Sequence, residues 1–441
     1  MSSYQTMKTP GDLSWFTHDR FGMFIHFGIY AIPARHEWVK SYEEISEETY
    51  DTYFKYFNPD LCDPREWARQ AKAAGMKYAV LTTKHHDGFC LFDSAYTDYK
   101  STNTPYGKDI VKQYADAFRA EGLHVGLYYS LLDWHHPDFT IDWYHPRRND
   151  PKAQELNKGR DLDRYAEYMK NQLRELLTNY GRIDILWFDF SYPDHVESRF
   201  IADKKPWMEA KGAEQWHSRE IIDMARELQP GIIINNRAGI EQDLYTPEQA
   251  HDLKWITHKQ TGELVNWEMC QTFSGSWGYN RDEMTWKSPE MLIKMLISTV
   301  SEGGNLILNV GPTGRGCLDY RAEETMAGIA QWMKYNGRSI HGCTKAEPEF
   351  VAPRNTRLTQ SQDGKRLYIH LIDYPFRGFE MANLAGKVEH AQFLHDGSEV
   401  KMCDGLEVAG VVHRVSDNGI LFVLPAVKPK VTVPVIELFL K

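Results

Sequence analysis

Short apolar segments alternate with amphipathic segments over roughly the first 340 residues. The apolar segments have the length of buried strands, and the intervening segments place apolar residues at helical spacing. Gly75, Gly122 and Gly181 follow three of the helical segments, where a left-handed cap is favoured. The pattern predicts repeated βα units. The predicted strands are residues 22–27, 78–83, 124–130, 183–188, 231–235 and 305–310, and the predicted helices are 64–74, 109–120, 162–177, 218–228 and 289–300.

Six or more βα units favour a closed barrel, so we expect an α/β fold with a (β/α)8-like TIM barrel. From about residue 343 the pattern changes to short alternating runs without helical spacing, which predicts a C-terminal antiparallel β-sandwich. The expected domains are therefore a barrel over 1–342 and a sandwich over 343–441. The predicted strands of the sandwich are residues 366–372, 387–393, 411–415, 420–424 and 431–440.

Polar side chains follow several of the predicted barrel strands. His26 ends the first strand, His85 and His86 follow the second, Asp189 ends the fourth and Arg237 follows the fifth. A single polar residue after a strand is usually a helix cap or a loop anchor. Because the carboxyl ends of parallel barrel strands meet at one face, several such residues together predict a functional site there.

Asp189 is the most distinctive of these residues. It closes an apolar run, where a carboxylate needs a specific reason to be present. The two-residue period of a strand places it on the same face as Ile185 and Trp187. Asp184 lies at the start of the strand and on the opposite face, which assigns it to the stabilising end of a barrel.

Composition restricts the class of protein further. The 441 residues include 51 Lys and Arg against 61 Asp and Glu, so the net charge of −10 gives no basic field for nucleic acid or anionic membranes. The chain is rich in aromatic residues, with 13 Trp, 24 Tyr and 20 Phe. Many of them lie near His or carboxylates, which is typical of sugar-binding clefts, although most such residues simply fill a core.

The six cysteines are widely spaced and form no CxxC pair, so we expect reduced thiols rather than a zinc site or a dense disulfide framework. No basic segment followed by an apolar one begins the chain, and no run of 18 apolar residues occurs. We therefore expect a cytoplasmic protein. A secreted protein whose signal has been removed would have the same sequence features, and a homo-oligomer stays open.

Two adjacent histidine pairs, His85 with His86 and His135 with His136, raise the alternative of a metal site. Successive side chains converge on one ion only if a loop folds them together, and no HExxH motif occurs. Hydrogen bonding of neutral imidazoles to substrate hydroxyls is the favoured interpretation. Because the GxGxxG and GxxxxGK[ST] motifs are also absent, no metal and no cofactor are expected.

An ordered set of motifs between about residues 14 and 340 resembles the α-L-fucosidases of glycoside hydrolase family 29. Each motif is weak alone, whereas the ordered set is specific. The resemblance implies a TIM-like barrel followed by a β-sandwich, retaining hydrolysis of terminal α-L-fucose, a fucosylated glycan or glycoside as substrate, and no cofactor. The motifs are RFGMFIHFG at 20–28, EW at 37–38, KHHDGF at 84–89, WFD at 187–189, NR at 236–237, WEMC at 267–270 and SWGY at 276–279.

The resemblance also assigns roles to residues. Asp189 matches the nucleophile at the end of a barrel strand. Tyr129 matches a substrate-binding tyrosine, although the adjacent Tyr128 is an alternative. Trp187 and Trp277 are expected to border the sugar ring. The residues expected to hold fucose are His26, Glu37, Trp38, His85, His86, Tyr129 and Arg237.

Retaining hydrolysis needs a second carboxyl group about 5 to 5.5 Å from the nucleophile, acting first as an acid and then as a base. Glu268 is our choice from the local pattern, because it lies beside Trp267 where an apolar setting would raise its pKa. Glu248 is the second candidate. Two other classes stay open at this point: an inactive fucose-binding barrel, in which both glutamates are bystanders, and a metal-dependent hydrolase.

Overall fold

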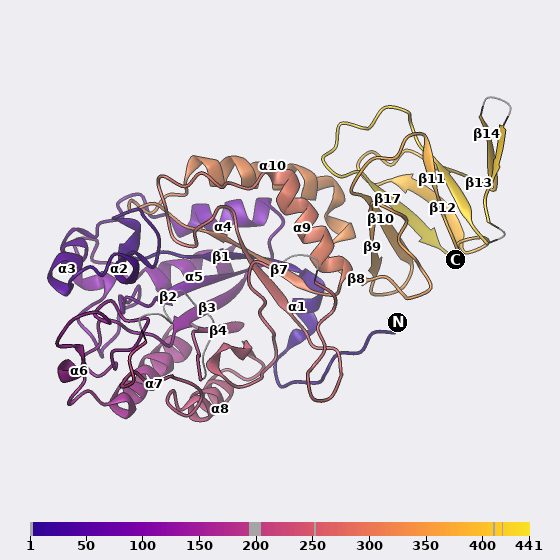
Figure 1. The fold of residues 1–441 in the computed structure, drawn as a ribbon. Coiled ribbons are helices and arrows are strands. Elements are labelled where there is room, and N and C mark those ends of the chain that lie inside the picture. The colour runs from indigo at the N-terminus through magenta and orange to yellow at the C-terminus, as the bar shows by residue number, and fades with distance from the viewer. Residues whose placement is uncertain (1–2, 194–203, 251–252, 409–410, 417) are drawn as a thin grey trace.

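The computed structural model describes residues 3–193, 204–250, 253–408, 411–416 and 418–441. Seven parallel strands form one curled sheet in the order β5-β4-β3-β2-β1-β7-β6 (Figure 1). The predicted strands are all present, and β6 is an additional one. The strands are β1 Phe21–Ile25, β2 Tyr78–Lys84, β3 His124–Ser130, β4 Ile185–Asp189, β5 Ile233–Ile234, β6 Glu268–Thr272 and β7 Asn305–Val310.

The segment 244–248 closes this sheet into a barrel. Its backbone hydrogen-bonds to β5 on one side and to β6 on the other, as in the bonds from Asn236 N to Leu244 O and from Glu268 N to Tyr245 O. The segment thus occupies the eighth position of the ring, and the predicted TIM-like fold is confirmed. Parallel bridges join the pairs Asn235–Leu244, Tyr245–Trp267 and Glu248–Cys270.

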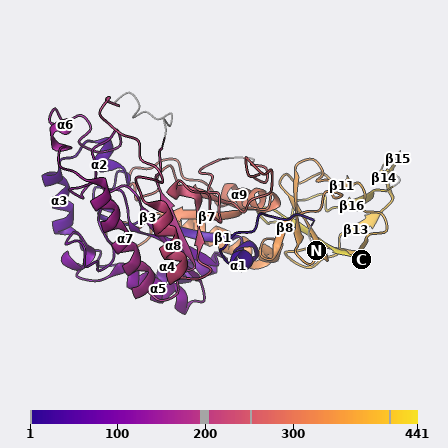
Figure 2. The same ribbon diagram turned by 90° about the horizontal axis from the view of Figure 1, so that it is seen from below.

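Helices surround the barrel (Figures 1 and 2). Several begin at a side chain that accepts a hydrogen bond from the first turn, as Asp109 does at α5 and Ser288 at α9. The long helices are α3 Glu47–Tyr56, α4 Pro64–Ala73, α5 Ile110–Ala120, α7 Leu162–Asn179, α8 Ser218–Leu228, α9 Pro289–Ser301 and α10 Tyr320–Asn336, and the short ones are α1 Leu13–Asp19, α2 Val39–Tyr42 and α6 Ala153–Leu156. No described helix is long and apolar enough to cross a membrane.

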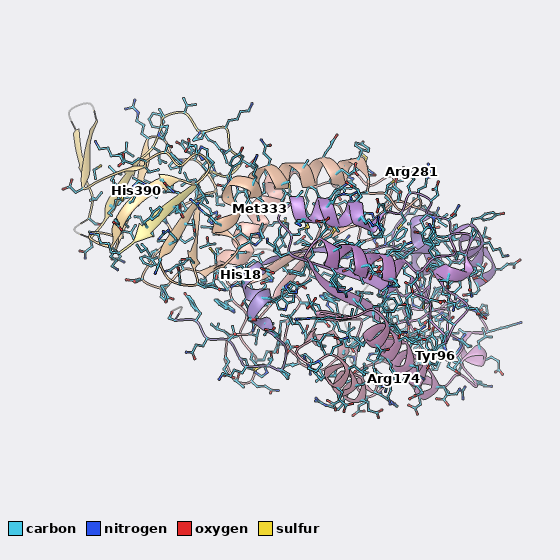
Figure 3. The ribbon with its side chains drawn as sticks, turned by 180° about the vertical axis from the view of Figure 1, so that it is seen from behind. His18, Tyr96, Arg174, Arg281, Met333 and His390 are labelled. Carbon is cyan, nitrogen blue, oxygen red and sulfur yellow. The ribbon has the colours of Figure 1, made fainter. Side chains whose placement is uncertain are left out.

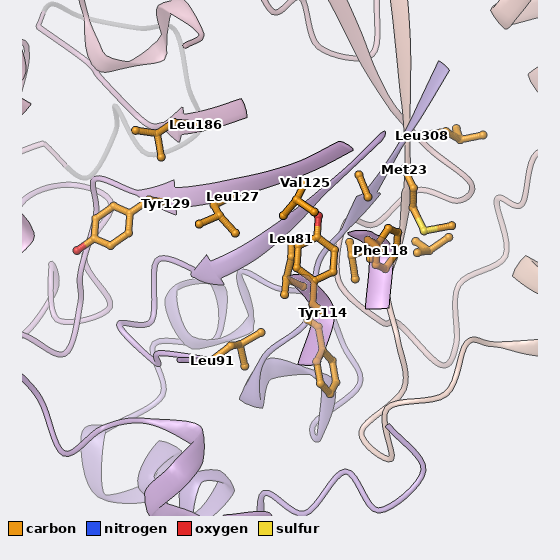
Figure 4. Packing of buried hydrophobic residues seen from close by; sticks show 14 of the residues in the cluster. Met23, Leu81, Leu91, Tyr114, Phe118, Val125, Leu127, Tyr129, Leu186 and Leu308 are labelled. Atoms are coloured by element: carbon orange, nitrogen blue, oxygen red, sulfur yellow. The ribbon is translucent and has the colours of Figure 1, made fainter. Parts of the chain in front are cut away.

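The barrel strands are buried on both faces, and each face has its own cluster. The interior cluster includes Phe24, Tyr128 and Trp187. The outer cluster, between the sheet and the helices, includes Leu127 and Tyr129 (Figure 4). Because successive side chains of a strand alternate between faces, the two-residue period decides which residues of a motif reach the barrel interior.

In the described part of the C-terminal region, the regular elements after residue 342 are all strands. One antiparallel sheet has the order β12-β17-β10-β9-β8, a second has β11-β16-β13, and β14 and β15 form a hairpin. Residues of the first two sheets share one apolar core, as in a β-sandwich. The strands are β8 Cys343–Lys345, β9 Thr356–Ser361, β10 Arg366–Leu371, β11 Gly378–Met381, β12 Val388–Phe393, β13 Lys401–Cys403, β14 Gly405–Val408, β15 Val411–Arg414, β16 Ile420–Val423 and β17 Val435–Leu440.

The sandwich packs against the barrel through α9 and α10. The indole of Trp332 on α10 donates to Val433 O, and Arg20 before β1 donates to Cys343 O. Figure 3 shows His390 among the C-terminal strands, Met333 of α10 in the middle, and Arg281 at the opposite end of the molecule. The sandwich therefore supports the helical side of the barrel.

Candidate active site

A small pocket with a volume of about 60 Å³ lies at the carboxyl ends of the barrel strands. It is lined by Phe24, His26, Glu37, Trp38, His85, His86, Tyr128, Trp187, Asp189, Phe190, Arg237, Glu248, Cys270 and Trp277.

Asp189 ends β4 and is held by two donors. The Tyr128 hydroxyl donates to Oδ2 at 2.8 Å, and Arg237 Nη1 donates to Oδ1 at 2.9 Å. Burial, together with the Asp189 charge, keeps the pKa of Tyr128 well above its usual value. Tyr128 therefore stays protonated and can serve as a permanent donor. The Asp189 side chain is 14% exposed, so it is held firmly yet open to the pocket.

Arg237 joins Asp189 to a second carboxylate. Its Nη2 lies 2.9 Å from Glu248 Oε2, and its Nε donates to Thr246 Oγ1. The guanidinium also lies over the Trp187 ring, 4.6 Å from the centroid. Burial acts to lower the pKa of Arg237, but the neighbouring Asp189 charge raises it above its usual value, so the group is always charged. Two carboxylates thus flank one cation at the pocket.

The histidines of the pocket are neutral. Burial lowers the pKa of His26 to about 3 and that of His86 well below its usual value. His26 Nδ1 lies 2.6 Å from Asn309 Oδ1, while the amide nitrogen of Asn309 donates to Trp277 O. We infer that His26 carries its proton on Nδ1, which leaves Nε2 as a hydrogen-bond acceptor. Such rings can form hydrogen bonds with sugar hydroxyl groups and do not titrate near neutral pH.

Two buried polar atoms of the pocket have no hydrogen-bond partner among the described residues: Glu37 Oε1 and His85 Nδ1. The other Glu37 oxygen accepts from Gly278 N at 2.8 Å. His36 Nδ1 lies 3.3 Å from Oε1, but it already accepts a hydrogen bond from Trp38 N. Buried polar groups are rarely left unpaired, so these two atoms indicate where a bound polar molecule would make hydrogen bonds.

Aromatic rings form the rest of the wall. Trp38 lies against His86 at 4.8 Å and against Phe190 at 5.1 Å between ring centroids, and Trp277 lies 5.2 Å from His26. Phe190, directly after Asp189, has a φ of 82°, which is costly for a non-glycine residue. The strained backbone thus lies where the carboxylate enters the pocket.

The prediction for Tyr129 is wrong. Its side chain lies in the outer cluster with Leu127 (Figure 4). There the hydroxyl donates to Gln172 on α7 at 2.7 Å. Lys84 Nζ lies 4.5 Å from its ring centroid. Because neighbouring residues of a strand point to opposite faces, Tyr128 lines the pocket instead.

The prediction for Glu268 also conflicts with the geometry. Glu268 is the first residue of β6, is 0% exposed and does not line the pocket. It pairs with Asn305, the first residue of β7, at the amino end of the barrel. Burial raises its pKa to about 7, which would suit an acid, but a proton donor must first reach the leaving atom. Glu248, the second candidate, does line the pocket and is 41% exposed.

The two histidine pairs do not converge. His85 and His86 line the pocket, whereas His135 stacks on Tyr99 outside it. Among the described residues, Glu47, Asp51 and His135 bring three candidate metal-ligand atoms within 4.8 Å of one another. Lys40 Nζ already lies 3.0 Å from Glu47 there, so a cation occupies part of that cluster.

A parallel barrel with paired carboxyl groups and neutral imidazoles in a small pocket at its carboxyl face defines a glycoside hydrolase. The family model for alpha-L-fucosidase matches residues 2–338. The chain therefore belongs to the alpha-L-fucosidase family.

Relatives and solved structures agree with this assignment. The tissue alpha-L-fucosidase of Mus musculus is 29% identical over 373 residues, covering 77% of this chain and 73% of the relative. The structure of alpha-L-fucosidase isoenzyme 1 from Paenibacillus thiaminolyticus is 44% identical, with a TM-score of 0.87 over 97% of this chain and 98% of that one.

A GH29 alpha-L-fucosidase from Bacteroides thetaiotaomicron has been solved as a trapped covalent intermediate with 2-fluoro-fucosyl fluoride. It is 26% identical, with a TM-score of 0.81 over 100% of this chain and 98% of that one. A covalent intermediate is the signature of a retaining glycosidase.

Proposed function

We propose that this chain releases terminal α-L-fucose from glycans or glycosides with retention of configuration, with Asp189 as the nucleophile and Glu248 as the general acid and base. The observation that carries the proposal is that Asp189 and Glu248 contact the two terminal nitrogens of Arg237, each at 2.9 Å, in one small pocket. This arrangement supports the short carboxyl separation that retaining hydrolysis needs.

In the first step Asp189 attacks the anomeric carbon, and the bond to the leaving oxygen breaks while Glu248 donates a proton to that oxygen. The sugar is then an ester of Asp189. In the second step Glu248 takes a proton from water, whose oxygen attacks the anomeric carbon and releases Asp189. Atoms and charges balance over the two steps, and no cofactor is needed.

Arg237 lies between the two carboxyl groups and contacts both of them. Ester formation at Asp189 removes one of its two negative partners while Glu248 stays beside it.

The remaining wall residues support recognition of fucose. His26, His85 and Glu37 offer donors and acceptors for hydroxyl groups, whereas Trp277 and Phe190 offer apolar faces for the methyl group on C5. The small volume favours an exo-acting enzyme that admits one terminal residue.

Turnover of an aryl α-L-fucoside, measured beside the matching galactoside and xyloside, tests the substrate. We expect hydrolysis of the fucoside alone. NMR spectra taken early in the reaction test the stereochemistry, and we expect the α anomer to form first. Initial release of the β anomer, or loss of activity in EDTA, would overturn the proposal.

Nucleic acid and membranes are not expected partners. All six cysteines lie in described residues without a disulfide, as their spacing predicts. A cytoplasmic location stays a prediction. A homo-oligomer stays possible as a prediction, and solution scattering or ultracentrifugation would test it.

A further inference from the structure

Glu268 is a buried carboxyl group that the proposed reaction does not use. It lies at the amino end of the barrel interior, and both of its oxygens accept hydrogen bonds from other strands. Tyr78 of β2 donates to Oε1 at 2.5 Å, and the Trp187 indole of β4 donates to Oε2 at 3.1 Å. One carboxyl group therefore ties β2, β4 and β6 together across the barrel.

The chain makes room for this arrangement. A side chain at Gly22 of β1 would place its Cβ 2.3 Å from the Tyr78 ring, so only glycine lets that ring lie flat across the barrel floor. Asn305 of β7 directs its amide nitrogen to the Phe16 carbonyl, with the Tyr78 hydroxyl 3.5 Å away. Tyr78 is thereby fixed, and its hydroxyl points at Glu268.

Trp187 connects this floor to the active site. Its indole N–H contacts Glu268, while its ring lies under the Arg237 guanidinium at 4.6 Å and stacks with Tyr128 at 5.8 Å and 20°. Arg237 and Tyr128 are the two donors that hold Asp189. A single indole therefore contacts both donors as well as Glu268.

We propose that Glu268 is a positioning residue, which fixes the Trp187 indole and through it the Arg237 and Tyr128 donors that orient Asp189. The inference rests on the proposed role of Asp189 but not on the identity of the acid and base. An indole has one N–H, which is its only hydrogen-bond donor, and it has no acceptor. Loss of Glu268 leaves that N–H unpaired in the barrel interior and frees the ring to turn.

A displacement of the nucleophile of about 1 Å can cost roughly 100-fold in rate. We therefore expect Glu268→Leu to lower kcat/KM about 10- to 100-fold, with most of the loss in kcat. The loss should be equal on a fucoside with an acidic phenol and on a natural disaccharide, because protonation of the leaving group is unaffected. A greater loss on the disaccharide would instead make Glu268 the general acid and overturn the proposal.

Glu268→Gln serves as the conservative variant. Its amide oxygen can accept from the Trp187 indole while its nitrogen donates to the Tyr78 hydroxyl, so the ring stays in place. We expect it to keep kcat/KM within about 3-fold of the parent. A loss as large as that of Glu268→Leu would show that the charge, rather than the position of the indole, matters.

A double-mutant cycle with Trp187→Phe tests the route of action. Trp187→Phe removes the indole N–H and keeps an aromatic ring. If Glu268 acts through that N–H, the two losses are not additive, and Glu268→Leu adds less than about 3-fold on the Trp187→Phe background. Fully additive losses would overturn the proposal.

The cycle is read on the acidic phenyl fucoside, whose departure needs little acid assistance. Its outcome is therefore independent of whether Glu248 is the general acid, so failure of the proposed function and failure of this inference are distinguishable. Should Glu268→Leu not fold, Glu268→Met replaces it in the same cycle, because its flexible side chain fits varied cavities and offers the indole N–H only a weak acceptor.

Tyr129→Phe is the matched control for lost stability. It removes a buried hydrogen bond to Gln172 on the outer face of the same barrel, away from the pocket. We expect a lower unfolding temperature with unchanged kcat/KM. A parallel fall in kcat/KM would show that any loss of barrel stability lowers activity, and the inference for Glu268 would not stand.

Discussion

The two ends of the barrel interior contain the same kinds of residue in contrasting roles. At the carboxyl end, Asp189 and Glu248 contact Arg237, and both are partly exposed. At the amino end, Glu268 is fully buried, and the uncharged Tyr78 and Trp187 donate to its carboxyl oxygens. In the roles that we propose, height along the barrel axis, rather than the identity of the side chain, separates the reacting carboxylates from the positioning one.

A second contrast runs across the sheet instead of along it. Tyr128 and Tyr129 are neighbours on β3, yet one donates to Asp189 and the other to Gln172 on α7. The strand has apolar residues on both faces, because helices cover the outside and side chains fill the inside. Neighbours in sequence therefore belong to different parts of the protein.

Asp189→Gly should give the largest effect, because it removes the nucleophile from the carboxyl end. We expect hydrolysis to fall about 10⁴- to 10⁶-fold with folding intact. Azide should enter the vacated space and yield fucosyl azide of inverted configuration, detectable by NMR. A variant that keeps most of its activity would remove Asp189 from the reaction.

Glu248→Ala should give the next largest effect and separates the two glutamates directly. General acid catalysis contributes roughly 10²- to 10⁴-fold, most for poor leaving groups. The loss should be large on a disaccharide and small on an acidic phenol, with azide giving a product of retained configuration. If Glu268 variants show this dependence and Glu248→Ala does not, the two ends of the barrel have been assigned the wrong way round.

The pH dependence of stability sharpens the comparison at the amino end. Burial raises the pKa of Glu268 to about 7, against 4.5 for an exposed glutamic acid. Between these values the folded state holds more protons than the unfolded state, so stability falls as pH rises. The raised pKa of Glu268 thus contributes roughly 3 kcal/mol to the free energy of unfolding. This contribution is complete below pH 4.5 and is lost as pH rises through 7.

Glu268→Gln cannot titrate and should lack this dependence. We therefore expect urea unfolding to show that the free energy of unfolding of the variant, relative to that of the parent, increases by roughly 2 to 3 kcal/mol from pH 5 to pH 8. An unchanged difference between the two proteins at both pH values would mean that Glu268 is not buried as described.

The smallest effects come from the tyrosine pair. Tyr128→Phe removes one of two donors to Asp189, and we expect kcat/KM to fall about 10-fold with little change in stability. Tyr129→Phe should do the reverse, costing about 1 kcal/mol of stability with normal kinetics. Steady-state kinetics and urea midpoints on both variants measure this, and equal kinetic losses would contradict the assignment of faces.

The sequence alone determined the repeated βα pattern, the all-β C-terminal region and most residues of the pocket. Strand length and apolar periodicity are local properties, and polar residues at the carboxyl ends of parallel strands must meet at one face. The two-residue period of a strand placed Asp189 on the same face as Ile185 and Trp187, which lie in the interior cluster.

Only the tertiary structure decided the positions of Tyr128, Glu248 and Glu268. The alternation of side chains divides a strand into two faces, but it does not say which face lies in the barrel interior when both are apolar. The segment 244–248 has no strand pattern of its own. It occupies the eighth position of the barrel because β5 and β6 supply its hydrogen-bond partners. The height of Glu268 depends on the register of β6 against β7, and register is set by packing between segments far apart in the chain.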